Sequence, residues 1–161
     1  MPQTKVTNIT AAGLGGQGVL KFTDILADLL FHAGYDVKKS EVHGMSQRGG
    51  SVSSEVRFGE SVASPMIPEG ESDYLVVLEN SQLEVNLGKL RAGGVLITPD
   101  DVPLDRLTNP KALNTMMLGA LASHLEIDRE RWIAELKAFL PEKLHALNIE
   151  MFDLGFQYRK H

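Results

Sequence analysis

Hydrophobic and polar positions in the first part of the chain predict a strand, a glycine turn and a helix. Residues 6–12 form a weakly polar segment typical of a strand, and this segment runs directly into a glycine-rich turn. Beyond the turn, apolar residues recur at the three- and four-residue spacing of a helix face; they are Val19, Phe22, Leu26, Leu29, Leu30 and Ala33. Gly34 stands where a C′ glycine belongs, so the helix is predicted to end there.

Further segments have the patterns of strands. Residues 35–40 follow the first helix as the natural second strand. Residues 51–58 alternate as a half-exposed strand does, with one side made of Val52, Ser54, Val56 and Phe58. Residues 74–78 are continuously apolar, and residues 95–98 form the next strand. A continuously apolar strand is typical of burial on both faces, which indicates a sheet covered by helices.

The remaining segments are predicted to be mostly helical. Ser81 and Glu84 form a capping-box pattern at the start of the first of these helices. The next two helices are predicted to start at Asn109 with Pro110 and at the capping residue Asp128, and Pro141 suits the first position of the last helix. Residues 99–109 show no sustained period and predict a loop. The last helix is predicted to end near Gly155, and residues 155–161 are expected to hold its end and a disordered polar tail.

These elements predict an α/β fold. We expect a three-layer α/β/α arrangement that is Rossmann-like, with an atypical, mostly parallel sheet and a helical C-terminal part. A chain of 161 residues suits one domain of ordinary size, spanning residues 1–161.

The amino-acid composition argues against several classes of function for this chain. The formal net charge of −5 and the absence of a dense Lys/Arg run argue against a nucleic-acid partner. The chain has no cysteine, which excludes a disulfide, a thiolate metal site and an iron–sulfur cluster held by its own cysteines. Its longest apolar run, residues 74–78, is far shorter than the roughly 20 residues of a membrane-spanning helix. The start lacks a secretory signal, so we expect a cytoplasmic protein without a membrane partner.

The first glycine stretch joins the predicted strand to the predicted helix. Gly13, Gly15 and Gly18 match the pattern G-x-G-x-x-G, and Gly16 and Gln17 lie within it. Backbone N–H groups at such a helix start lack partners within the helix and suit a phosphate or carboxylate. Glycine at a tight turn serves close packing equally often, so this stretch alone leaves both interpretations open.

The second strand and its connection argue against an ordinary dinucleotide site. A nicotinamide-binding domain would place an acidic residue about 20 residues after the glycines. Here Lys38 and Lys39 precede Glu41, and the two lysines could suit a 2′-phosphate. However, a parallel crossover needs a helix, and only the glycine-rich residues 41–50 separate the second and third strands.

The second glycine stretch carries the richest candidate chemistry. Its donors and flexible backbone suit convergence on an anion or a carboxylate. The candidate ligand- or interface-binding residues of this stretch are Glu41, His43, Gly44, Ser46, Gln47, Arg48, Gly49, Gly50 and Ser51. Arg48 could hold an anion bidentately, or it could be solvated or paired with Glu41 or Glu55. No nucleophile or carboxylate partner can be assigned to His43, so no catalytic residue is named.

The two glycine stretches together resemble the gamma-type domain of 2-oxoacid:ferredoxin oxidoreductases, closest to the beta subunit of the indolepyruvate type. The residues that carry this resemblance are 13–18, 40–52, Ser64 with Pro65, Glu79, and 114–120. Relatives usually carry a further helix and strand between residues 98 and 114, which puts the strand count of this chain in question.

The resemblance implies an accessory subunit of a larger enzyme. The complex would convert an aryl-type 2-oxoacid to its acyl-coenzyme A by oxidative decarboxylation and pass electrons to ferredoxin. Thiamine diphosphate, magnesium and the iron–sulfur clusters would belong to a larger partner subunit, which would also meet ferredoxin, and this chain alone would bind no cofactor and be inactive. Two other functions remain open at this point: a stand-alone NADP-binding enzyme and a non-catalytic, regulatory anion-binding module.

Overall fold

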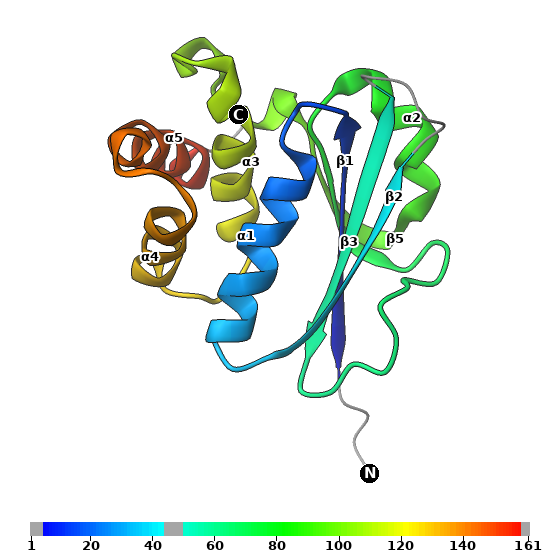
Figure 1. Cartoon of the computed structure of the whole chain (residues 1–161). Helices are drawn as coiled ribbons and strands as arrows, with labels where there is room; N and C mark the ends of the chain where they lie inside the picture. Colours follow the sequence, from blue (N-terminus) through cyan, green and yellow to red (C-terminus); the bar gives the residue numbers. More distant parts are fainter. Residues whose placement is uncertain (1–4, 44–49, 159–161) are drawn as a thin grey trace.

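The computed structural model describes residues 5–43 and 50–158, and of His43 only the backbone. Its strands within these residues are β1 (Val6–Leu14), β2 (Asp36–His43), β3 (Ser51–Gly59), β4 (Ser72–Val77) and β5 (Leu90–Ile97). They form one open sheet in the order β2-β3-β1-β4-β5 (Figure 1). The predicted strands are thus confirmed, although β5 begins at Leu90, which the sequence predicted to lie within a helix ending near Gly93 and Gly94.

The sheet is mixed. In the described part of the chain, β1 pairs with β4 and β4 with β5 in parallel, whereas β3 is antiparallel to both β1 and β2. The α/β class and the atypical, mostly parallel sheet are confirmed, because four of the described strands run in one direction and β3 runs against them. Because β2 and β3 are neighbours that run in opposite directions, they do not need the crossover helix that joins a parallel pair.

The long helices all pack on one face of the sheet (Figure 1). The long helices on this side are α1 (Val19–His32), α3 (Leu113–Ala122), α4 (Arg129–Phe139) and α5 (His145–Gln157). Helices α3 and α5 are packed backbone to backbone, since a Cβ at Gly155 would lie 1.9 Å from the Met116 carbonyl oxygen. The predicted helical C-terminal part is therefore present, and α5 continues past Gly155 to Gln157.

The other face of the sheet is covered thinly. Within the described residues it carries the four-residue α2 (Leu83–Asn86) with flanking 3₁₀ turns, and the extended segment between β3 and β4. Arg57 holds that segment through the carbonyls of Ser64 and Met66, at 2.9 and 3.0 Å. The expected capping box at Ser81 is not formed, because Glu79 caps this helical stretch by accepting the Ser81 N–H.

The connections after β5 are short helical turns. Residues 99–109, expected to be a loop, contain the 3₁₀ turns Pro99–Asp101 and Leu104–Arg106. Asn109 accepts the Lys111 N–H and caps the next turn, as predicted. Asp128 precedes α4 as its N-cap residue but makes no side-chain capping bond. The last predicted helix start, Pro141, opens a 3₁₀ turn before α5.

Candidate functional site

The two glycine stretches meet at the end of the sheet where strands β1 and β2 terminate and β3 begins. There Leu14 lies opposite Ser51, and His43 lies opposite Val52. The Gly15 N–H donates to the Gly50 carbonyl at 2.9 Å, which joins the two stretches directly. The carboxyl end of β4 lies beside that of β1. Open α/β sheets bind ligands outside the carboxyl ends of their strands, which is where these glycine stretches lie.

The glycine turn has a backbone conformation that residues with a side chain rarely adopt. Gly16 and Gly18 have φ values of +91° and +80°, in the left-handed region. A Cβ at Gly18 would also lie 2.6 Å from Nδ2 of Asn114, on α3. Nδ2 of Asn114 in turn donates to the Gly18 carbonyl at 3.4 Å, a long hydrogen bond. The glycine at this position therefore serves both the turn and the close approach of α3.

Gln17 closes the turn and ties it to β4. Its Oε1 accepts the Leu14 N–H at 2.7 Å, and its Nε2 donates to Oε1 of Glu79 at 3.2 Å. The other carboxylate oxygen of Glu79 accepts the Ser81 N–H at 3.2 Å. Gln17 thus acts on its own loop and also holds the glycine turn against the end of β4.

A surface cavity of about 330 Å³ lies against the glycine turn. Its lining consists of Leu14, Gly15, Gly16, Gly18, Val19, Leu20, Lys21 and Val52. Among the described residues of this lining, Lys21 is the one that is ionisable, and helix α1 has neither a side-chain cap nor an acid in its first turn. The backbone donors at this helix start, with a nearby ammonium and no lining carboxylate, suit an anionic group.

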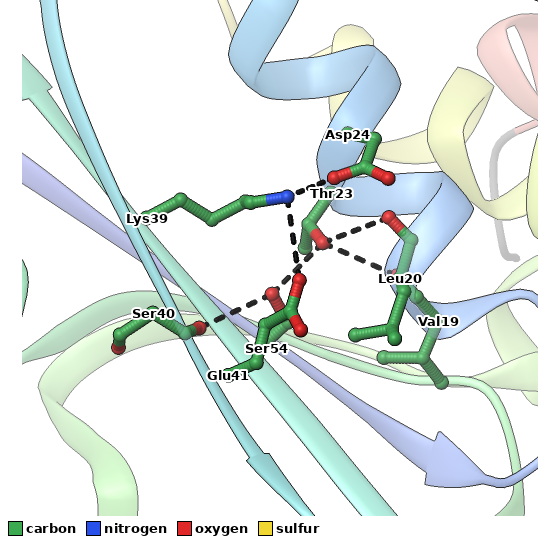
Figure 2. Close-up of polar contacts among 8 residues, drawn as sticks. All are labelled: Val19, Leu20, Thr23, Asp24, Lys39, Ser40, Glu41 and Ser54. Carbon is green, nitrogen blue, oxygen red and sulfur yellow. Dashed lines mark hydrogen bonds and ion pairs between the residues drawn. The ribbon is translucent and has the colours of Figure 1, made fainter.

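The two lysines of β2 form ion pairs with carboxylates. Nζ of Lys38 lies 3.2 Å from Oδ1 of Asp36, and Lys39 pairs with Asp24 of α1 and, at 3.4 Å, with Glu41 (Figure 2). Partial burial lowers the pKa of the Lys39 ammonium, but hydrogen bonds to the two carboxylates and their charges outweigh this, so its pKa is raised. These ion pairs count against the proposed use of Lys38 and Lys39 for a 2′-phosphate.

Two buried hydroxyls fix α1 on the sheet beside this site. Oγ1 of Thr23 and Oγ of Ser54 lie 2.8 Å apart, and both side chains are fully buried (Figure 2). Oγ1 of Thr23 also lies 3.1 Å from the Leu20 carbonyl oxygen, and Oγ of Ser54 lies 3.3 Å from the Ser40 carbonyl oxygen. Each hydroxyl has one proton, so one of them donates to the other hydroxyl and the second donates to its own carbonyl. The second turn of α1 is therefore connected to β3 and β2 at the level where the glycine stretches meet.

The candidate residues of the second stretch are only partly placed. Ser51 donates from Oγ to Oε1 of Gln82 at 2.7 Å, and Gly50 accepts from Gly15. Glu41 lies apart from the glycine turn, in the ion pair with Lys39. The candidates that lie outside the described residues are Gly44, Ser46, Gln47, Arg48 and Gly49, and for His43 only the backbone is described.

Glu79, Gln82 and Asn114 contact the predicted site residues but were not among the predicted site residues themselves. Glu79 had a usable signal, because it follows the continuously apolar strand and carboxyl ends of parallel strands gather at one edge. Asn114 lies in the stretch 114–120 that carries the family resemblance, whereas Gln82 gave no signal in the sequence.

The described residues contain no group of three or more His, Cys, Asp or Glu side chains arranged to hold a metal ion. A search of the same residues for a helix long and apolar enough to cross a membrane finds none.

The fold and the meeting of the glycine stretches define a Rossmann-like α/β domain in which two glycine-rich connections are joined by a backbone hydrogen bond. The model of the family described as pyruvate ferredoxin/flavodoxin oxidoreductase matches residues 8–109, so the chain belongs to that family. Its similarity to subunits of 2-oxoacid:ferredoxin oxidoreductases confirms the resemblance found in the sequence.

Two curated relatives carry the name indolepyruvate oxidoreductase subunit IorB. The protein of Pyrococcus horikoshii is 38% identical over 143 residues, covering 87% of this chain and 68% of that protein. The protein of Thermococcus kodakarensis is 44% identical over 94 residues, covering 58% of this chain and 46% of that protein. The matched stretch thus spans less than half of the Thermococcus protein.

A solved structure supports the fold. The gamma subunit of a keto/oxoacid ferredoxin oxidoreductase from Geobacter sulfurreducens superposes with a TM-score of 0.79 at 23% identity, covering 94% of this chain and 96% of that one. The comparisons favour neither a stand-alone NADP-binding enzyme nor a regulatory module. Because the relatives are named as subunits of oxidoreductases, they support a hetero-oligomer.

Proposed function

We propose that this chain is the accessory subunit of a thiamine diphosphate-dependent 2-oxoacid:ferredoxin oxidoreductase that acts on indolepyruvate or a related aryl pyruvate. The complex decarboxylates the 2-oxoacid oxidatively, forms the acyl-coenzyme A and passes electrons to ferredoxin. A larger partner subunit carries the thiamine diphosphate with magnesium and the iron–sulfur clusters, and this chain binds none of them alone. The complex works in the cytoplasm.

The observation that carries this proposal is the direct bond between the Gly15 N–H and the Gly50 carbonyl. It brings both glycine stretches to one edge, beside a cavity whose lining has a lysine and no carboxylate. Coenzyme A and a 2-oxoacid both present anionic groups, which backbone donors at a helix start stabilise. The names of the curated relatives point to indolepyruvate as the substrate.

The proposed contact residues are those of the two glycine stretches. From the first we include Gly13, Gly15, Gly16, Gln17 and Gly18, and from the second His43, Gly44, Ser46, Gln47, Arg48, Gly49, Gly50 and Ser51. Glu41 stays in the set as a residue beside the site, since its carboxylate neutralises Lys39. The role of Arg48 rests on its sequence context alone: a guanidinium offers planar, bidentate donors that match a carboxylate or phosphate.

Reconstitution tests the proposal. The chain is co-expressed with the large subunit, and coenzyme A-dependent reduction of ferredoxin is measured with indolepyruvate and with pyruvate. We expect turnover only in the complex, with a higher kcat/KM for indolepyruvate. Arg48→Ala and Arg48→Lys should each reduce affinity or turnover about 10-fold to 150-fold, which corresponds to one charge-assisted hydrogen bond.

The melting temperature of both Arg48 variants should stay close to that of the wild type, because the proposal has this side chain bind a ligand or the partner and not stabilise the fold. Iron bound to the chain alone, or oxidation of a 2-oxoacid by it, would contradict the proposal. Unchanged kinetics in both variants would remove Arg48 from the site and leave the assignment of the subunit intact.

A further inference from the structure

A further cavity, with a volume of about 160 Å³, lies at the starts of α3 and α5. Its described lining comes from α1, from the turn that precedes α3, from the residues after α4, and from the first turns of α3 and α5. No glycine of either glycine stretch belongs to this described lining. The cavity is therefore a feature separate from the one at the glycine turn, although Lys21 lines both.

The ionisable residues of the described lining are both basic. They are Lys21 and Lys111, and both are exposed. Neither lysine pairs with a carboxylate in the part of the chain that the structure describes, in contrast to Lys38 and Lys39 of β2. In a chain with a formal net charge of −5, two ammonium groups beside a cavity without a described carboxylate favour an anionic ligand.

Another wall of the cavity is apolar. It consists of Leu140, Leu144 and Leu147, and the last two are only half-buried. A simple inorganic anion would leave this apolar surface in contact with water, whereas a ligand with an apolar body would cover it. A cavity of roughly 150 Å³ holds one benzene-sized molecule, so the volume suits a single aromatic ring.

The polar wall is held in place by buried hydrogen bonds. Oγ1 of Thr115 donates to Oδ1 of Asn148 at 2.6 Å, and Nδ2 of Asn148 donates to the Leu144 carbonyl at 2.9 Å. Oδ1 of Asn114 accepts the Thr115 N–H at 3.0 Å. Thr115, Asn114 and Asn148 are 3%, 6% and 7% exposed, so this wall exists before any ligand binds.

We propose that this cavity binds a small aromatic carboxylate, with its ring against the three leucines and its carboxylate toward Lys21 and Lys111. The lysines supply the charge that selects an anion, and the leucines supply the surface that selects a ring. The two requirements together distinguish this ligand class from free phosphate, which lacks the ring, and from a neutral aromatic molecule, which lacks the charge.

Three probes test the ligand class on the full chain. Benzoate has the ring and the charge, benzyl alcohol has the ring alone, and inorganic phosphate has the charge alone. Calorimetric titration should show saturable binding of benzoate, with each of the other two probes at least about tenfold weaker. Amide shifts in NMR spectra should locate benzoate at residues 109–115 and 144–148. Equal binding of benzyl alcohol or of phosphate, or no saturable binding of benzoate, would overturn the proposal.

Two substitutions test the residues. Lys111→Gln should weaken benzoate binding about threefold to fivefold, the effect of one exposed ion pair. Lys143→Gln is the matched control, because Lys143 is also exposed and lies outside the described lining, and it should leave the affinity unchanged. Leu147→Trp fills the cavity and should abolish binding.

Equal affinities of the Lys111 and Lys143 variants would refute the assigned contact. The melting temperature shows whether Leu147→Trp is folded, and the Lys111 comparison decides the matter if it is not. The same titrations are repeated on the co-expressed complex. Binding that depends on Lys111 in the isolated chain and disappears in the complex would assign the cavity to the subunit interface and overturn the proposal.

This inference does not depend on the proposed function. Benzoate binding that requires Lys111, in a chain that forms no active oxidoreductase, would keep the site and refute the proposed function. An active complex whose small subunit binds no benzoate would do the reverse.

Discussion

Nε2 of Gln17 donates to Oε1 of Glu79 at 3.2 Å and so connects the glycine turn to the end of β4, 62 residues later in the chain. The same side chain accepts the Leu14 N–H at 2.7 Å. A single glutamine therefore uses its acceptor for its own turn and its donor for a neighbouring strand. A carboxylate in its place would keep the first bond and lose the second.

We predict that Gln17→Glu lowers the free energy of unfolding by about 1–2 kcal/mol, because it places a carboxylate against Glu79 at a partly exposed site. In a Glu79→Gln background the same change should cost much less, since an amide at position 79 can donate to a carboxylate at position 17. Urea unfolding of the four proteins in this double-mutant cycle measures the coupling. Strictly additive costs would show that the two side chains do not interact in solution.

Gly18→Ala should destabilise the chain more than Gly16→Ala. Both glycines have positive φ, and an alanine there costs about 1–2 kcal/mol for the left-handed conformation. At Gly16 nothing lies within 4 Å of an added Cβ, whereas at Gly18 the Asn114 amide lies at 2.6 Å. Chemical denaturation should show an excess cost at Gly18 that Asn114→Ala relieves. Equal costs at both glycines would mean that the Asn114 side chain moves aside freely.

Gly119→Ala and Gly155→Ala should each cost about 3 kcal/mol or more, because the added methyl group meets backbone that cannot give way. The nearest atoms are the Phe152 carbonyl oxygen at 2.1 Å and the Met116 carbonyl oxygen at 1.9 Å. Gly88→Ala is the control, since its added Cβ meets only Oε1 of Glu69 at 3.8 Å. Thermal and urea unfolding check the contrast, and a mild effect at both helix glycines would disprove the close contact between α3 and α5.

The contact between α1 and α4 should depend on pH. Glu135 accepts a hydrogen bond from the imidazole of His32, and this bond, followed by the carboxylate charge, raises the pKa of His32. A raised pKa in the folded state means that the stabilisation is complete below the ordinary histidine value of about 6.5 and is lost as pH rises through the folded-state pKa.

The measurement is the difference in unfolding free energy between the wild type and His32→Gln from about pH 5.5 to about pH 9. We expect this difference to shrink as pH rises. Glu135→Gln should remove the pH dependence of the difference, and an NMR titration of His32 should show its pKa above the ordinary value. A difference that grows with pH would contradict the ion pair.

The pair of buried hydroxyls should behave as one unit. Thr23→Val and Ser54→Ala should each cost about 1–3 kcal/mol, because each leaves the other hydroxyl buried without this partner. The double variant should cost clearly less than the sum of the two single variants, since the hydrogen bond between the two hydroxyls can be lost only once. Urea unfolding decides between this result and simple addition.

Much of the fold and part of the site follow from local sequence patterns. The helix that begins at Val19 and stops before Gly34 was predicted because spacing and a glycine C-terminus are properties of neighbouring residues. The glycines at 16 and 18 mark a turn for the same reason, since only glycine adopts positive φ without strain. The family resemblance also depended on contiguous stretches, and the comparisons confirm it.

Tertiary structure decided which of these segments meet. The antiparallel course of β3 between β2 and β1 brings Gly50 to Gly15, and the carboxyl end of β4 brings Glu79 to Gln17. Local periodicity reports which face of a segment is buried and carries no information on the direction or identity of its neighbour. Those depend on contacts between residues far apart in the chain, which form only when the whole sheet and its helices pack together.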